Sequence, residues 1–201
     1  MISWFGPIFY GSYSASEIGF MTLKSSSEAF HKPGSVGKVL AGGKIKILGK
    51  NRQELSPHQS GLIYIDLLMF GKFDYTNFDG DSNTFTYQNY ISVGDIGNLD
   101  EEEEDDYLFI NDRQKNMIIS GGANIFPLEI ESVLVQMHDI VDCATFGTVQ
   151  CQPTTIITLE QMHQFLDGKL ARFKFPRNLN IHSKLPTKDS GKIFKQKLRS
   201  S

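Results

Sequence analysis

Short apolar runs separated by charged or glycine-rich turns dominate the chain, and most have the length and alternation of β-strands. The clearest are residues 44–48, 61–66 and 140–146, which we expect to form strands. Residues 9–23 are rich in aromatic and small side chains and predict a strand that enters a tight turn near residues 14–17. The pattern therefore favours a sheet-rich fold.

Two later segments instead show helical spacing. Pro127 stands where a first helical turn would begin, and apolar residues from Ile130 to Met137 recur every three or four positions. Residues 127–138 and 159–170 are therefore predicted helices. Between the two classes of element, the apolar runs 107–110 and 117–119 are flanked by charged turns and predict a β-hairpin, with Asp112 and Arg113 at its junction. The expected class is α+β.

Composition narrows the function classes. The 201 residues suffice for one large domain or two small ones, and a net charge of −3 argues against a nucleic-acid-binding surface. No apolar run approaches the ~20 residues of a membrane helix, and the first residues lack the features of a secretion signal. We expect a cytoplasmic protein in which Cys143 and Cys151 are free thiols.

Three further patterns favour ordinary structural roles. Asp74, Asp79 and Asp81 lack the spacing of a calcium loop, and the five histidines form no ligand motif. The acidic run 101–106 predicts a solvated hairpin turn, because runs of like charge are usually exposed.

Several spaced motifs follow one another in the second half of the chain. They are Gly94-Asp95, Asp112-Arg113-Gln-Lys115-Asn116, Gly121-Gly122-Ala-Asn124-Ile-Phe-Pro127, Glu129-Ile-Glu131 and, near the end, Leu185-Pro-Thr-Lys-Asp-Ser-Gly191-Lys192. In this order they resemble the adenylate-forming ligases, which include acyl- and aryl-CoA synthetases, luciferases and the adenylation domains of peptide synthetases. The resemblance implies ATP, Mg²⁺ and coenzyme A as cofactors and a carboxylic acid as substrate.

The resemblance extends to the turn near the start of the chain. Tyr13-Ser14-Ala15-Ser16-Glu17 is similar to the family motif Tyr-Gly-x-Thr-Glu, which implies that Tyr13 and Ser16 contact adenine and phosphate and that Glu17 binds Mg²⁺. Carboxylate oxygen suits that hard cation. A second register uses Tyr10 and keeps Glu17. Read without the family, such a turn is most simply a helix cap.

Four other positions acquire implied roles in the same way. Asp95 and Arg113 match the residues that bind the ribose, a task for which a carboxylate can accept from two hydroxyls. Lys115 matches the hinge about which the small C-terminal domain swings. Gly121 and Gly122 match a loop that lies along the coenzyme A tunnel, although a plain glycine hairpin turn would have the same sequence.

Lys192 matches the adenylation lysine of the C-terminal motif. A flexible ammonium on a glycine turn can reach the carboxylate and the α-phosphate and stabilise the negative charge there. A Gly-Lys pair alone would carry no such implication. Together with the other motifs, it is the most specific assignment in the chain.

The resemblance also defines expected domains. Residues 1–112 would be the end of the large, β-rich AMP-binding domain, joined by the hinge to a small α+β swinging domain over residues 113–201. The family's phosphate loop has no counterpart here, and Ser14, Leu62 and Val93 replace usual residues. After Gly147 the sequence is shorter than in the family, and we expect a loop and a core strand to be missing.

Two hypotheses follow for the function. The chain is either part of an AMP-forming acyl-CoA ligase, with a fatty acid as the expected substrate and no activity alone, or a non-catalytic remnant or interaction subunit of a split ligase. Of these, the split ligase would require a separately encoded N-terminal fragment as partner. Because part of a large domain would leave apolar surface uncovered, self-association is also expected.

Overall fold

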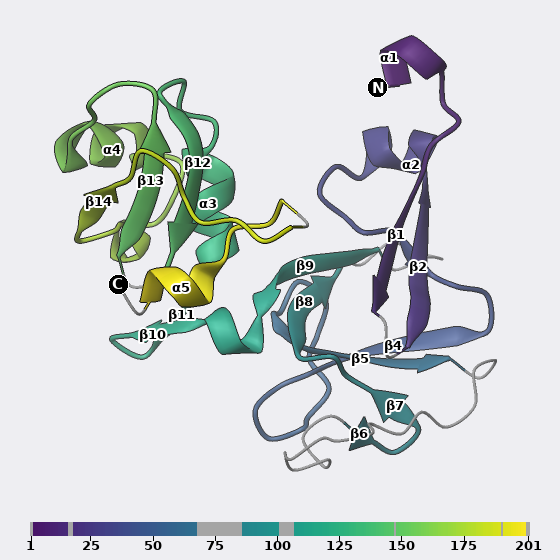
Figure 1. Cartoon of the computed structure of the whole chain (residues 1–201). Coiled ribbons are helices and arrows are strands. Elements are labelled where there is room, and N and C mark those ends of the chain that lie inside the picture. The colour runs from purple at the N-terminus through teal and green to yellow at the C-terminus, as the bar shows by residue number, and fades with distance from the viewer. Residues whose placement is uncertain are drawn as a thin grey trace. The chain divides into compact units, whose positions relative to one another are not determined.

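The computed structural model of the 201-residue chain describes residues 2–15, 18–67, 86–100, 107–146, 148–189 and 191–199. The chain divides into two compact units, residues 1–115 and 116–201. Lys115, the predicted hinge, is therefore the last residue of the first unit, and the division lies three residues after the expected domain boundary. Each unit contains strands and helices (Figure 1), and the α+β class is confirmed.

The first unit is built mainly from β-strands. Its elements are α1 (Ile2–Phe5), β1 (Tyr10–Ala15), β2 (Gly19–Ser25), α2 (Ser26–His31), β3 (Lys38–Val39), β4 (Gly43–Leu48), β5 (Gly61–Leu67), β6 (Thr86–Tyr87), β7 (Tyr90–Ile91), β8 (Asp95–Leu99) and β9 (Leu108–Arg113), followed by the 3₁₀ turn η2 (Gln114–Asn116). The strands β1-β2-β3 form one sheet, and β6-β7-β5-β8-β9 form another in which β4 also pairs with β5.

A buried cluster joins the two sheets of this unit. Met21 from β2, Ile47 from β4, Ile63 and Ile65 from β5 and Leu108 from β9 are all inaccessible or nearly so. The turn before β3 holds the sheets together, because Val36 donates a backbone hydrogen bond to Leu108 and Leu108 donates one to Gly37. Gly37 has a positive φ, and a Cβ atom there would collide with the carbonyl of Leu23. The turn therefore has a structural role, because it connects the two sheets.

The predicted hairpin between residues 107–110 and 117–119 is wrong. Strand β9 pairs antiparallel with β8, while β10 (Ile118–Ser120) pairs with β11 (Ala123–Ile125). The acidic run 101–106 that links β8 to β9 lies outside the described residues, as does the segment with Asp74, Asp79 and Asp81. Strand β9 therefore pairs with β8, the strand that precedes the acidic run, and not with the apolar run that follows it.

The second unit packs helices on a three-stranded sheet. After β10 and β11 come α3 (Pro127–Leu134), β12 (Ile140–Thr145), β13 (Val149–Pro153), α4 (Leu159–Leu166), the 3₁₀ turn η3 (Arg172–Lys174), β14 (Leu179–Ile181) and α5 (Lys195–Arg199). Strand β13 lies in the middle, antiparallel to β12 and parallel to β14. Both long helices are shorter than predicted, and a Thr158 capping box begins α4.

The expected loss of a core strand after Gly147 is also wrong. The segment that follows is β13, whose residues Val149, Gln150 and Cys151 are buried in the centre of the sheet. Its polar side chains are satisfied, since Gln150 donates to the Thr148 hydroxyl at 2.8 Å and its Oε1 lies 2.6 Å from His182 Nε2. The segment after Gly147 therefore supplies the central strand of this sheet.

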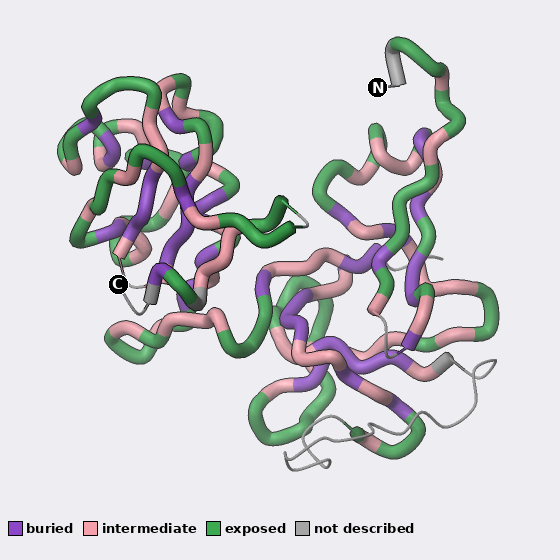
Figure 2. Tube along the Cα trace, in the orientation of Figure 1, coloured by how far each residue is buried: buried purple, intermediate pink, exposed green. Residues whose placement is uncertain are grey.

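The core of the second unit is continuous. Ile130 and Leu134 from α3 and Met162 and Leu166 from α4 pack on β12 and β13. Figure 2 shows the buried positions along these strands and helices. Cys143 and Cys151 are cross-strand neighbours with free, buried thiols, as predicted. A hydrogen bond between the two thiols, together with burial, raises the pKa of Cys143. Among the described residues no helix has the length and apolar character needed to cross a membrane.

Candidate functional site

Three of the predicted site residues meet in the first unit. Asp95 begins β8 and is 5% exposed, and the β8–β9 register sets it opposite Arg113. Arg113 Nε lies 3.2 Å from Asp95 Oδ1, and the Tyr13 hydroxyl donates to Oδ2 at 2.6 Å. The structure therefore gathers Tyr13, Asp95 and Arg113 into one polar cluster, although Tyr13 and Asp95 are 82 positions apart in sequence.

The chemistry of this cluster suits recognition of hydroxyl groups. Among the described residues each carboxylate oxygen of Asp95 has one partner, and a carboxylate offers about four acceptor positions. The Arg113 side chain is 59% exposed, so donors of its guanidinium face solvent. A buried carboxylate held from two sides and an accessible guanidinium beside it can bind a polyhydroxylated, anionic ligand.

The structure separates the two tyrosines that the sequence left open. Tyr13 is 8% exposed, and its ring packs in the core with Ile18 and Met21. Tyr10 is 68% exposed at the start of β1. Tyr13 therefore acts here as a hydrogen-bond donor to Asp95, which the sequence reading missed, and Tyr10 has the accessible ring. Ser16 and Glu17 lie outside the described residues, so their roles toward phosphate and Mg²⁺ remain predictions.

The predicted glycine loop forms a two-residue hairpin turn. Gly121 and Gly122 connect β10 to β11 with φ values of +57° and +81°. Two successive positive φ values are typical of the tight turns that match strand twist, and glycine adopts them without steric cost. No described atom lies within 4 Å of a Cβ built at either position, so the turn is open on its outer side.

Lys192 lies on a second hairpin, near the end of the chain. Thr187 and Ile193 form an isolated bridge, the Lys188 amide donates to the Lys192 carbonyl at 2.9 Å, and the Phe194 amide donates to Pro186 at 2.7 Å. Gly191 has a φ of +78° in the turn. The Lys192 side chain is exposed, and its ammonium has no hydrogen-bonding or ionic partner among the described residues. The backbone of Lys192 is therefore fixed by hydrogen bonds, while its ammonium is accessible to a ligand.

A buried carboxylate near this hairpin escaped the sequence reading as a site residue. Glu131 on α3 is 9% exposed and accepts both contacts of Lys195 Nζ, at 2.7 and 2.9 Å. The signal was present in the sequence, because residues 127, 130, 131 and 134 share the inward face of the helix, and a charged residue on such a face needs a partner.

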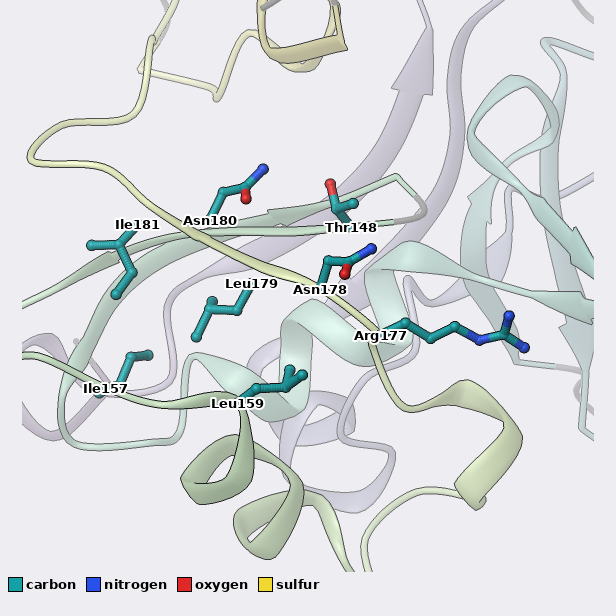
Figure 3. A pocket seen from close by; sticks show the side chains of 8 residues that line it. All are labelled: Thr148, Ile157, Leu159, Arg177, Asn178, Leu179, Asn180 and Ile181. Carbon is teal, nitrogen blue, oxygen red and sulfur yellow. The ribbon is translucent and has the colours of Figure 1, made fainter.

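An open cleft in the second unit is separate from all these residues. It has a volume of about 520 Å³ and is lined by Thr148, Ile157, Leu159, Arg177, Asn178, Leu179, Asn180 and Ile181. Figure 3 shows that Arg177 extends away from the apolar side chains. No predicted site residue lines this cleft.

Comparison with known proteins identifies the class. A 2-succinylbenzoate–CoA ligase of Oceanobacillus iheyensis is 31% identical over 203 residues, which is 96% of this chain and 41% of the relative. A long-chain-fatty-acid–CoA ligase of Mycobacterium tuberculosis is 29% identical over 89% of this chain and 37% of its own length. No family model matches.

The solved structures agree. O-succinylbenzoate CoA synthetase of Bacillus subtilis, in complex with its acyl-adenylate intermediate, superposes with a TM-score of 0.84 at 25% identity, over 96% of this chain and 41% of the synthetase. The same enzyme with ATP and magnesium ion gives a TM-score of 0.83 at 26% identity, over 94% and 41%. The chain belongs to the AMP-binding acyl- and aryl-CoA ligases and corresponds to their C-terminal part. It spans about 40% of the length of these relatives.

Proposed function

We propose that this chain supplies the C-terminal part of an AMP-forming ligase that activates a fatty acid and transfers it to coenzyme A. The observation that carries the proposal is Lys192, whose ammonium is exposed and has no partner in the described part of the chain, and which stands on an anchored glycine hairpin at the position of the family's adenylation lysine. In the first step a carboxylate oxygen attacks the α-phosphorus of ATP and pyrophosphate leaves. In the second the thiol of coenzyme A attacks the acyl carbon, a proton is released and AMP leaves.

The two units would divide these tasks. Asp95 would accept from the ribose hydroxyls and Arg113 would donate to ribose and phosphate oxygens, with Tyr13 orienting the carboxylate. Tyr10 has the ring available for adenine, and Ser16 and Glu17 would bind phosphate and magnesium. Bound Mg²⁺ would neutralise part of the phosphate charge. Lys192 would stabilise the charge that develops between carboxylate and α-phosphate.

The fatty acid is proposed as the acyl substrate, which is more specific than the membership in the ligase family. The relatives include a 2-succinylbenzoate ligase and a long-chain-fatty-acid ligase, so their acyl groups differ in kind. The residues that would bind the acyl chain belong mainly to the part of those relatives that this chain does not span. We propose a cytoplasmic location because ATP and coenzyme A are the proposed substrates.

The alternative is an interaction subunit or remnant with no catalysis of its own. The exposed aromatic side chains of the first unit favour a partner, since Trp4, Phe5, Tyr10, Phe20 and Phe30 are all accessible. Uncovered aromatic surface of this kind is typical of a face that packs on further protein. We therefore propose that catalysis requires an N-terminal ligase segment in addition to these 201 residues.

The test is carboxylate-dependent exchange of labelled pyrophosphate into ATP. The chain would be assayed alone and mixed with the N-terminal segment of a related ligase, over a panel of fatty and aryl acids. We expect exchange only in the mixture and most strongly with fatty acids. Exchange by the chain alone would contradict the need for a partner. The absence of exchange in every mixture would favour the non-catalytic alternative.

A further inference from the structure

The buried carboxylate of Glu131 connects three elements of the second unit. Its two oxygens lie 2.7 and 2.9 Å from Lys195 Nζ, and the Thr145 amide at the end of β12 donates to Oε1 at 2.6 Å. Burying a charge is costly unless it is paired and hydrogen-bonded, and Glu131 meets both conditions. Such pairs often contribute little net stability compared with apolar packing, and here the pair connects α3 to α5 and to the end of β12.

The partner of Glu131 belongs to the segment that carries Lys192. Lys195 is the first residue of α5 and follows Lys192 by three positions. Leu198, one turn further, is buried against Ala144 and Leu185, and Ile193 packs on the same cluster. The short stretch between the hairpin and α5 is therefore held at both ends, by the Thr187–Ile193 bridge on one side and by Glu131 and Leu198 on the other.

This arrangement fixes the backbone around Lys192, while the Lys192 ammonium has no partner among the described residues. Its carbonyl is fixed by the Lys188 amide, and the next residues are fixed by the Phe194–Pro186 hydrogen bond and the Lys195–Glu131 ion pair. A lysine side chain has four rotatable bonds and cannot hold its own ammonium in place. The precision of that charge thus depends on the position of the backbone.

We propose that Glu131 and Lys195 are positioning residues, which hold the Lys192 hairpin where its ammonium can serve the adenylation step. This inference rests on the proposed function for the reaction, but the structural part of it concerns the hairpin alone. A misplacement of a reacting group by ~1 Å can lower a rate by about 10²-fold. The ion pair is therefore expected to act on turnover rather than on nucleotide binding.

The same helix offers a matched control. Glu129, two residues before Glu131, accepts both contacts of Lys174 Nζ, at 2.6 and 2.8 Å. That pair joins α3 to η3 and does not involve the Lys192 segment. It has the same residue types, the same helix and the same two-oxygen geometry, but it is more exposed, since the Glu129 side chain is 38% exposed against 11% for Glu131, and it anchors a different segment.

The experiment compares Lys195→Met, Lys195→Arg and Lys174→Met in the full chain by amide hydrogen exchange and, in the mixture described above, by pyrophosphate exchange. Because Lys195→Met leaves a buried charge that can weaken folding, the double variant Glu131→Gln/Lys195→Met is made as well. For both Lys195→Met proteins we expect at least a ~10-fold loss of protection at the Lys188, Gly191 and Phe194 amides, with β12 and β13 unchanged. Turnover should fall by about 10- to 100-fold with little change in the KM for ATP.

Lys195→Arg should restore both readouts, and Lys174→Met should alter neither. Unchanged protection of the three hairpin amides in the Lys195→Met variants would overturn the proposal, as would an equal effect of Lys174→Met. If wild-type mixtures show no exchange activity, the proposed function fails, and the amide protection still decides whether the ion pair holds the hairpin.

Discussion

The two units differ in the number of aromatic side chains that they leave exposed. In the first unit five accessible aromatic residues lie within positions 4–30, whereas Phe173 is the one exposed large aromatic residue found among the described part of the second unit. In the second unit, the helices α3 and α4 pack on the strands β12 and β13. The difference indicates that the first unit has more of the uncovered aromatic surface that typically packs on further protein, in keeping with a chain that spans about 40% of its relatives.

The largest expected effect concerns the closed core of the second unit. Leu134→Ala removes a fully buried side chain from the contact between α3 and the sheet. We expect a loss of about 2–5 kcal/mol in the free energy of unfolding, because the cavity cannot collapse in a packed interior. Urea denaturation followed by circular dichroism measures it. A loss below ~1 kcal/mol would show that the core of the second unit is loosely packed.

A smaller effect is expected at the polar cluster of the first unit. Tyr13→Phe removes the hydroxyl that donates to Asp95 and leaves a buried carboxylate with one partner fewer. The free energy of unfolding should fall by about 1–3 kcal/mol, the usual range for an unsatisfied buried group. Tyr10→Phe is the control, because that ring is exposed. Equal effects of the two substitutions would contradict the assignment of Tyr13 as the residue that orients Asp95.

The pH dependence of stability distinguishes the first unit in another way. Burial opposes ionisation of Asp100, but hydrogen bonds from Lys32 and from the Tyr107 amide outweigh it and lower the pKa of this carboxyl. A carboxyl whose folded pKa lies below its unfolded value stabilises the fold above the unfolded value, and this stabilisation disappears as the pH falls through the folded pKa.

Denaturation at pH 7 and at pH 3 tests this directly. The free energy of unfolding should fall on acidification, with a contribution from Asp100 of about 1 kcal/mol. In Asp100→Asn that part of the pH dependence should be absent. An identical acid response in the variant would show that Lys32 does not stabilise the ionised carboxyl.

The smallest effect on stability is expected for the exposed aromatic residues of the first unit. Phe20→Ser combined with Phe30→Ser should change the free energy of unfolding by less than ~0.5 kcal/mol, because both rings are 61% or more exposed. The same variant should associate less with itself and with an N-terminal ligase segment, measured by sedimentation velocity. Phe173→Ser in the second unit is the control. If it reduces association equally, Phe20 and Phe30 do not mediate association specifically.

How far the sequence predicted this molecule depended on the distance between interacting residues. Local signals were sufficient for the Gly121–Gly122 turn and for the start of α3 at Pro127, because a turn or helix terminus is defined by neighbouring residues. The strand pairing of β9 was mispredicted, since its partner lies upstream across the acidic run rather than in the next apolar run.

Polar residues in buried positions caused the other errors. Gln150 and Gln152 made β13 resemble a loop, yet the Gln152 side chain accepts from the Leu185 amide at 3.0 Å and Gln150 is satisfied within the sheet. The ion pair of Glu131 and the contact of Tyr13 with Asp95 join residues 64 and 82 positions apart. Such contacts follow from tertiary packing, which no local pattern specifies.

We propose above that Lys192 is the adenylation lysine of an AMP-forming ligase. The most direct measurement is fatty-acid-dependent ATP–pyrophosphate exchange by the chain mixed with an N-terminal ligase segment, for the wild type, Lys192→Ala and Lys184→Ala. Lys184 is exposed on the segment before the hairpin and is the matched control. We predict a loss of about 10²-fold or more in Lys192→Ala, the magnitude of one missing electrostatic contact in a transition state, and little change in Lys184→Ala. Exchange at the wild-type rate in Lys192→Ala would contradict the account.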